Sequence, residues 1–120
     1  MTILLVEDDN FFQKFYSTKL RDNNITVEIA SNGEEGLQKM REMHFDAVLL
    51  DLVMPKIDGF EVLRTMSSDP ELKKLPVLVF STLSQEGDID KAKALGAKDY
   101  MNKTFFNFEE LMKKINALVG

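Results

Sequence analysis

The chain alternates between short hydrophobic runs and longer stretches in which hydrophobic residues recur every three or four positions. The short runs are rich in Leu, Ile and Val, which is typical of buried strands, whereas the longer spacing is that of amphipathic helices. The runs that we expect to form strands are Ile3–Val6, Ile25–Ile29, Ala47–Leu50, Val77–Phe80 and Tyr100–Met101.

Five helical patterns follow these runs, one after each. Gly96 is placed to end the fourth helix, and Asn107 with Glu110 has the spacing of an N-cap for the fifth. The positions that we expect on the core side of the helices are, in chain order, Phe11, Phe15 and Leu20; Leu37 and Met40; Phe60, Leu63 and Met66; Ile89, Ala92 and Leu95; and Phe108, Leu111, Met112, Ile115 and Leu118.

This strict alternation predicts an α/β fold, with a five-stranded parallel sheet and helices on both of its faces. Ala47–Leu50 and Val77–Phe80 are hydrophobic throughout, as expected of central strands that are covered on both sides. The run around Tyr100–Met101 is more polar and suits an edge strand. No linker or repeat interrupts the pattern, so we expect residues 1–120 to form a single domain.

The net charge of −5 arises in the first half of the chain, because residues 1–60 hold 11 acidic and 6 basic side chains while the remainder is balanced. No basic patch argues for direct binding to nucleic acid. A local excess of acid instead suits a bound cation.

We expect a cytoplasmic protein with no membrane association. The chain has no cysteine, which fits a reducing compartment. No hydrophobic stretch approaches the roughly 20 residues needed to cross a bilayer. Met1 and Thr2 lead directly into a hydrophobic run without the basic segment of a signal peptide.

Polar residues follow four of the predicted strands. Glu7 and Asp8 follow the first, Asp51 the third, Ser81 the fourth and Lys103 the fifth. Because ligands of open α/β sheets bind beyond the carboxyl ends of the strands, we expect these side chains to form one site.

The composition of that site suggests phosphoryl chemistry. Three carboxylates in one place would repel one another unless a cation came between them, and Mg²⁺ prefers such oxygen ligands. Lys103 and Ser81 suit the oxygens of a phosphoryl group. Asp51 would then be a nucleophile that forms an aspartyl-phosphate.

Four segments carry a resemblance to a known family. They are "ILLVEDD", "DAVLLDLVMPKIDGFEVLR", "DPELKKLPVLVFST" and "ALGAKDYMNK", and they occur in order over essentially the whole chain. In them the chain resembles the receiver domains of two-component response regulators, the CheY-like family. The resemblance implies a (βα)5 flavodoxin-like fold with strand order 2-1-3-4-5, which the alternation alone leaves open.

The resemblance also implies roles for the acidic residues. Asp51 corresponds to the phosphoacceptor. Asp8 corresponds to a direct ligand of Mg²⁺ or another divalent cation, and Glu7 to the acid that holds metal-bound water. Val53 would contribute its backbone carbonyl to the metal.

By the same resemblance, Lys103 corresponds to the phosphate-binding lysine, Ser81 to the switch hydroxyl and Tyr100 to the switch aromatic. The family usually has a proline after the lysine, joined by a cis peptide bond, but here the residue is Thr104. A cis bond before a residue other than proline costs about 3–4 kcal/mol. We therefore expect Lys103 to be held less rigidly than is usual in the family.

The resemblance implies a phosphorelay signalling protein that catalyses only its own phosphorylation and dephosphorylation. A histidine kinase or phosphotransfer protein would supply the phosphoryl group. The surface of the fourth helix, fifth strand and fifth helix would then bind a downstream partner. The chain would be a monomer or a phosphorylation-dependent dimer, and would act alone or as part of a longer regulator.

Two rival functions stay open. Thr104 is compatible with a receiver-like module that binds proteins without phosphorylation. An aspartyl-phosphate phosphatase would need a second Asp two residues after the nucleophile, where this chain has Val53.

Val53 and Leu83 correspond to positions that flank the acyl phosphate, and neither side chain can orient a water molecule. We therefore expect slow loss of the phosphoryl group. The combined substitutions Val53→Asn and Leu83→Glu should accelerate this loss, which intact mass spectrometry can follow over time. An unchanged rate would contradict the assignment.

Overall fold

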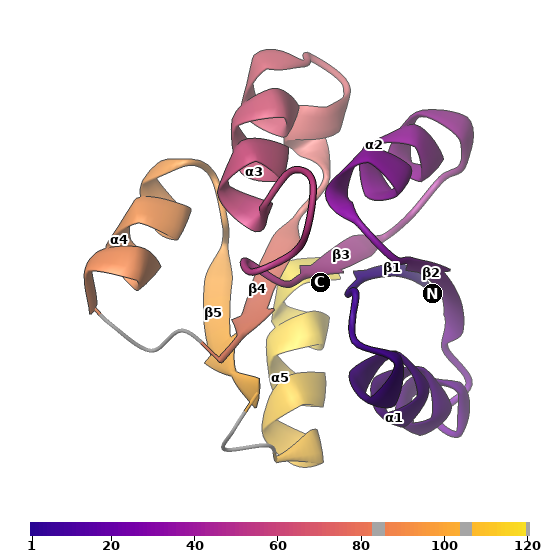
Figure 1. Cartoon of the computed structure of the whole chain (residues 1–120). Helices are drawn as coiled ribbons and strands as arrows, with labels where there is room; N and C mark the ends of the chain where they lie inside the picture. The colour runs from indigo at the N-terminus through magenta and orange to yellow at the C-terminus, as the bar shows by residue number, and fades with distance from the viewer. Residues whose placement is uncertain (83–85, 104–106, 120) are drawn as a thin grey trace.

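The computed structural model describes residues 1–82, 86–103 and 107–119, and within them it contains a five-stranded parallel sheet of order β2-β1-β3-β4-β5 (Figure 1). The predicted fold and strand order are therefore confirmed. In chain order the elements are β1 (Thr2–Val6), α1 (Asn10–Arg21), β2 (Thr26–Ala30), α2 (Gly33–Glu42), β3 (Ala47–Leu50), α3 (Gly59–Ser68), the short 3₁₀ helix η1 (Leu72–Lys74), β4 (Val77–Ser81), α4 (Glu86–Ala94), β5 (Asp99–Asn102) and α5 (Phe108–Val119).

The register places the carboxyl ends of the inner strands side by side. Leu50 at the end of β3 pairs with Val6 on β1 and with Val79 on β4. β5 lies at one edge of the sheet, as its polar sequence predicted, and β2 lies at the other. The loops that follow β1, β3, β4 and β5 thus all leave from the end of the sheet where the carboxyl termini of the strands lie, which we call the carboxyl edge.

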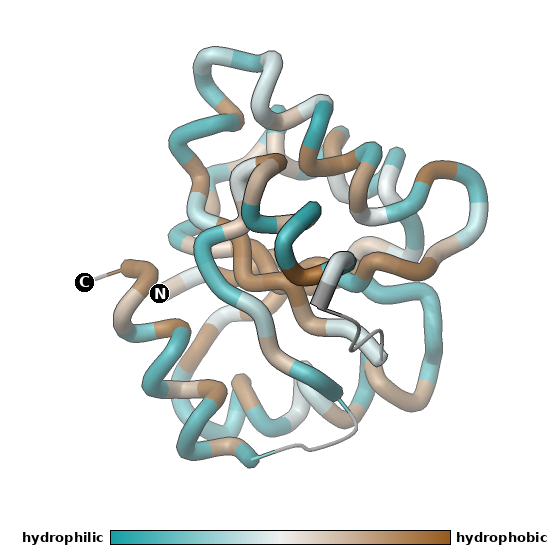
Figure 2. Tube along the Cα trace, turned by 90° about the vertical axis from the view of Figure 1, so that its left-hand side faces the viewer, coloured by the Kyte–Doolittle hydropathy of each residue, from teal (hydrophilic) through white to brown (hydrophobic). Residues whose placement is uncertain are grey.

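Helices cover both faces of the sheet, and each face has its own hydrophobic core. α1 and α5 pack on one face, and α2, α3 and α4 pack on the other (Figure 1). Hydrophobic segments gather at the centre of the molecule, while the outer turns of the helices are largely hydrophilic (Figure 2). None of the described helices is long and hydrophobic enough to cross a membrane.

The core side of α1 differs from the prediction. Phe11 is 69% exposed, whereas Tyr16 and Leu20 are fully buried and Phe12 packs against the same core. The side chains at positions 12, 16 and 20 are each one turn of helix apart, so they share the face that meets the sheet. The prediction failed because Phe11 and Phe12 are adjacent and equally hydrophobic. The four-residue spacing between Phe11 and Phe15 favoured Phe11, although Phe12 is the residue that packs on the core.

The predicted helix ends are confirmed. Asn107 accepts a hydrogen bond from the backbone N–H of Glu110 at 3.1 Å, as an N-cap does. Gly96 ends α4 with a φ of 115°, a conformation that favours glycine. Asp9 and Asp58 cap α1 and α3 in the way that Asn107 caps α5.

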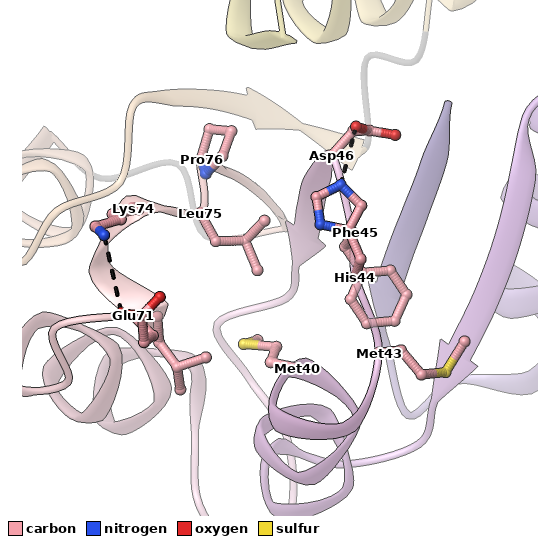
Figure 3. A pocket seen from close by; sticks show the side chains of 10 residues that line it. Met40, Met43, His44, Phe45, Asp46, Glu71, Lys74, Leu75 and Pro76 are labelled. Atoms are coloured by element: carbon pink, nitrogen blue, oxygen red, sulfur yellow. Dashed lines mark ion pairs between the residues drawn. The ribbon is translucent and has the colours of Figure 1, made fainter.

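A hollow of about 470 Å³ lies at the other end of the sheet, near the amino ends of β3 and β4 (Figure 3). At its rim His44 lies 3.6 Å from Asp46, and Lys74 lies 3.9 Å from Glu71. His44, the sole histidine of the chain, thus lies exposed after α2 and far from the carboxyl ends of the strands.

Gly59 is required where the loop after β3 turns back on itself. A Cβ atom at this position would lie 2.5 Å from the carbonyl oxygen of Asp51 and 2.7 Å from the Cα of Leu52. Both neighbours are backbone atoms, which cannot move without displacing the end of β3. A side chain on the first residue of α3 would therefore displace the backbone at Asp51.

We expect Gly59→Ala to lower the free energy of unfolding by about 2 kcal/mol or more, because the methyl group overlaps backbone atoms. Gly87→Ala is the matched control, since a Cβ at this exposed helical position would have no neighbour within 4 Å. The control should be neutral or stabilising by up to about 1 kcal/mol. Urea unfolding measures both, and equal effects would contradict the steric argument.

Candidate functional site

Three carboxylates meet at the carboxyl edge of the sheet. Glu7, Asp8 and Asp51 each offer an oxygen atom, and these atoms lie within 4.8 Å of one another. Strand pairing produces this proximity, because the backbone N–H of Asp51 donates to the carbonyl of Val6 at 3.0 Å, one residue beyond β3. The expectation that these residues come together is met.

The three acids differ in their access to solvent. Glu7 and Asp51 are 2% and 5% exposed, whereas Asp8 is exposed. Two carboxylates therefore form the floor of the cluster, and the third lies at its open side. A ligand can approach from the side of Asp8.

Lys103 supplies a buried positive charge from the end of β5. Its ammonium donates a hydrogen bond to Oε1 of Glu7 and lies 3.3 Å from Oδ2 of Asp51. The side chain is almost inaccessible, with the whole residue 6% exposed. Buried charges of this kind are tolerated when they are paired and hydrogen-bonded, as all three are here.

The pKa of Glu7 is raised to about 7. Burial is the main cause, since it disfavours the charged form, and the negative charge of Asp51 acts in the same direction. The hydrogen bond from Lys103 opposes both effects without cancelling them. Near neutral pH the cluster therefore exchanges a proton readily.

Ser81 and Tyr100 lie on the strands next to this cluster. Ser81 ends β4 beside β3 and is fully buried. Tyr100 on β5 is half-buried against the core of α2, α3 and α4, and its hydroxyl is buried without a hydrogen-bond partner among the described residues. Burial and the charges of Asp88 and Asp51 raise the pKa of this hydroxyl. The proposed switch roles of both residues stay predictions.

The remaining predicted positions are placed unequally. Val53 is 55% exposed, and its backbone N–H donates to Oδ1 of Asp51 at 3.3 Å. Its predicted carbonyl contact with a metal is untested. Leu83 and Thr104 lie outside the described residues. The prediction that Lys103 is held less rigidly than is usual in the family stays a prediction.

Two residues that the sequence pattern did not predict support the cluster. Gln13 donates from its side-chain amide to the carbonyl of Glu7 at 2.6 Å and to the hydroxyl of Ser31 at 3.1 Å. Phe12 places its ring under Lys103, with 4.4 Å between the ammonium and the ring centroid. For Phe12, the one-turn spacing to the buried Tyr16 was the available signal. No local pattern indicates Gln13.

The donor set fits a hard divalent cation. Mg²⁺ takes oxygen ligands and commonly binds through one or two carboxylates together with water and a phosphate, and this cluster offers three carboxylates. The neighbouring ammonium adds a second positive group that a phosphoryl oxygen can contact. The cluster can therefore bind a cation and an anionic group side by side.

The comparisons with known proteins agree with this geometry. A family described as the response regulator receiver domain matches residues 3–116. The cell cycle response regulator CtrA of Brucella ovis is 34% identical over 119 residues, which cover 99% of this chain and 50% of that protein. The chain thus spans about half the length of the curated relatives it matches.

Solved structures of receiver domains and response regulators share the fold of this chain. The receiver domain of the sensor histidine kinase PA1611 from Pseudomonas aeruginosa, with magnesium in its active site cleft, has a TM-score of 0.91 at 25% identity, covering 99% of this chain and 97% of that one. The response regulator TrrA of Thermotoga maritima, in complex with Mg(2+)-BeF, has a TM-score of 0.85 at 30% identity, covering 98% and 97%.

We expect divalent cations to bind more weakly at acidic pH. Because the pKa of Glu7 is about 7, this carboxyl group is mostly protonated at pH 6 and mostly ionised at pH 8. A bound cation competes with that proton, so the affinity for Mg²⁺ should fall about tenfold between pH 8 and pH 6. Calorimetric titration with MgCl₂ at the two pH values measures the change.

The control is Glu7→Gln, which cannot ionise. This variant should bind Mg²⁺ more weakly than wild type at pH 8, and its affinity should change little between the two pH values. Equal pH dependence in both proteins would show that another group controls the binding.

Proposed function

The chain belongs to the family of response regulator receiver domains, and on that premise we propose that it accepts a phosphoryl group on Asp51. The observation that carries the proposal is the meeting of Glu7, Asp8 and Asp51 with the ammonium of Lys103 at one edge of the sheet. Receiver domains are signalling modules of two-component systems and not turnover enzymes. The product would be a modified, signalling form of the chain.

Glu7, Asp8 and Asp51 are the residues that would hold Mg²⁺ or another divalent cation, with the carbonyl of Val53 completing the set. Their carboxylate oxygens lie close enough together to share one ion. When bound, such an ion neutralises the repulsion between a carboxylate and an incoming phosphate.

Asp51 is the nucleophile in this proposal. One of its carboxylate oxygens would form a bond to phosphorus while the bond between phosphorus and the donor breaks, and the donor leaves with the electron pair. Low exposure keeps competing water away from the attacking oxygen. Lys103, 3.3 Å from Asp51, would then bind a phosphoryl oxygen.

Ser81 and Tyr100 would transmit the change. Ser81 ends the strand beside Asp51, so its hydroxyl could donate to a phosphoryl oxygen. Tyr100 on the next strand has a buried hydroxyl with no partner in the described part of the chain, so turning the ring would break no hydrogen bond there. Movement of both side chains would alter the surface of α4, β5 and α5.

The partners follow from the family. The donor would be a phosphohistidine of a histidine kinase or phosphotransfer protein, and a downstream protein would bind the surface of α4, β5 and α5. The similar protein CtrA is twice as long as the matched region. The signal would therefore be passed either to a separate partner protein or to another domain of a longer chain.

Incubation with acetyl phosphate and MgCl₂ tests the proposal. We expect intact mass spectrometry to show the gain of one phosphoryl group in wild type. Asp51→Asn should gain none, because its side-chain amide is not nucleophilic. A chelator should abolish the gain in wild type.

Folding of Asp51→Asn must be verified by circular dichroism, since Asp51 belongs to a buried charge cluster. If folded wild type gains no phosphoryl group, the proposal is wrong and a phosphorylation-independent interaction module becomes the better account. A gain in both proteins would place the acceptor elsewhere.

A further inference from the structure

The ammonium of Lys103 has a third neighbour besides the two acids. The ring of Phe12 lies beneath it at 4.4 Å from the nitrogen to the ring centroid. The face of an aromatic ring attracts a cation, and the attraction is stronger where water is excluded. Lys103 is 6% exposed, so this contact is largely dry.

Neighbouring rings hold Phe12 in place. Its ring stacks on Tyr16, with centroids 5.8 Å apart and planes 9° apart. Tyr16 is fully buried and meets the ring of Phe80 edge-on at 4.3 Å. Phe80 belongs to the inner strand β4. The ring under Lys103 is thus supported, through Tyr16, by a strand inside the sheet.

The first turn of α1 fixes the backbone of Phe12 as well. Its N–H donates to Oδ1 of the N-cap Asp9 at 3.1 Å. Asp9 directly follows the exposed acid Asp8 in the loop after β1. This cap therefore joins the acidic loop to the helical turn that carries the ring beneath Lys103.

Phe12 differs from the acids in one respect that matters for function. Glu7 and Asp51 would both turn toward a bound cation. The carboxylate of Asp51 would also lose its negative charge once one of its oxygens is bonded to phosphorus. The attraction between Lys103 and Phe12 depends on neither event. The ring of Phe12 therefore keeps its contact with Lys103 while Glu7 and Asp51 exchange their interaction partners.

We propose that Phe12 is a positioning residue that holds the Lys103 ammonium at the acidic cluster through a cation–π contact. The functional part of this inference rests on the proposed phosphorylation of Asp51. The contact itself does not. Phe12 would keep Lys103 in place after a cation has engaged the acids and before a phosphoryl oxygen has arrived.

The contact has a spectroscopic signature. Protons above an aromatic ring resonate upfield, so the ε-methylene signal of Lys103 should be displaced upfield in wild type. We would label lysine with ¹³C and assign this signal by its loss in Lys103→Arg. Phe12→Leu should return the signal to the usual lysine position, whereas Phe12→Tyr should retain the displacement.

Phe15→Leu is the matched control. Phe15 lies on the same helix and has its own lysine, with the Lys19 ammonium 5.7 Å from the ring centroid. This substitution removes a similar pair away from the acids and should leave the Lys103 signal unchanged. Phe12→Met provides a second non-aromatic variant with a flexible, space-filling side chain, should Phe12→Leu fold poorly.

The kinetic readout is phosphoryl uptake from acetyl phosphate at saturating MgCl₂. Phe12→Leu and Phe12→Met should be slower by about fivefold to thirtyfold, the range expected for a desolvated cation–π contact. Phe12→Tyr should restore the rate, and Phe15→Leu should match wild type. Saturating MgCl₂ keeps any change in Mg²⁺ affinity out of the compared rates.

The two proposals fail in different ways. A wild type that takes up no phosphoryl group overturns the proposed function, and the Lys103 signal then still decides whether Phe12 holds the ammonium. A Phe12→Leu variant that keeps the upfield signal overturns the contact. A lost signal with an unchanged uptake rate overturns the positioning role.

Discussion

The site depends on the burial of one ammonium group between carboxylates. Lys103 reaches Glu7 and Asp51 from the end of the edge strand β5, and all three residues are almost inaccessible to water. Each charge alone would cost several kcal/mol to bury, so each requires the others. Removing Lys103 would leave two buried acids in repulsion. Removing either acid would strip the ammonium of a partner. The three charges therefore stabilise one another. A new ligand can bind only by replacing one of the existing ion pairs.

Rigid neighbours surround this exchangeable cluster. Strand pairing places Asp51 next to Val6, and the missing side chain of Gly59 lets the following loop turn back over it. Asp9 and Gln13 tie the acidic loop to α1 and to the loop after β2. The aromatic side chains of α1 extend this support to Lys103. A fixed backbone around ion pairs that can be exchanged suits a site that must bind a ligand, react and return to its starting state.

Much of this could be predicted from particular residues. The continuous hydrophobic runs predicted the inner strands within a residue, and the polar residue after each run predicted the members of the site. Asn107 and Gly96 predicted helix ends through local hydrogen bonding and backbone freedom, which neighbouring residues determine. The core side of α1 was predicted wrongly at Phe11, because two adjacent phenylalanines satisfy helical periodicity equally and only the sheet distinguishes them.

The sequence by itself determined the order of strands and helices and the chemical groups at the strand ends, because hydrophobic periodicity and capping act over a few residues. The tertiary structure alone decided what those groups meet. It brought Lys103 to Glu7 and to the ring of Phe12, residues more than 90 positions away, and it raised the pKa of Glu7 by burial. Such properties depend on distance and on the exclusion of water, and both exist only once parallel strands have aligned their carboxyl ends.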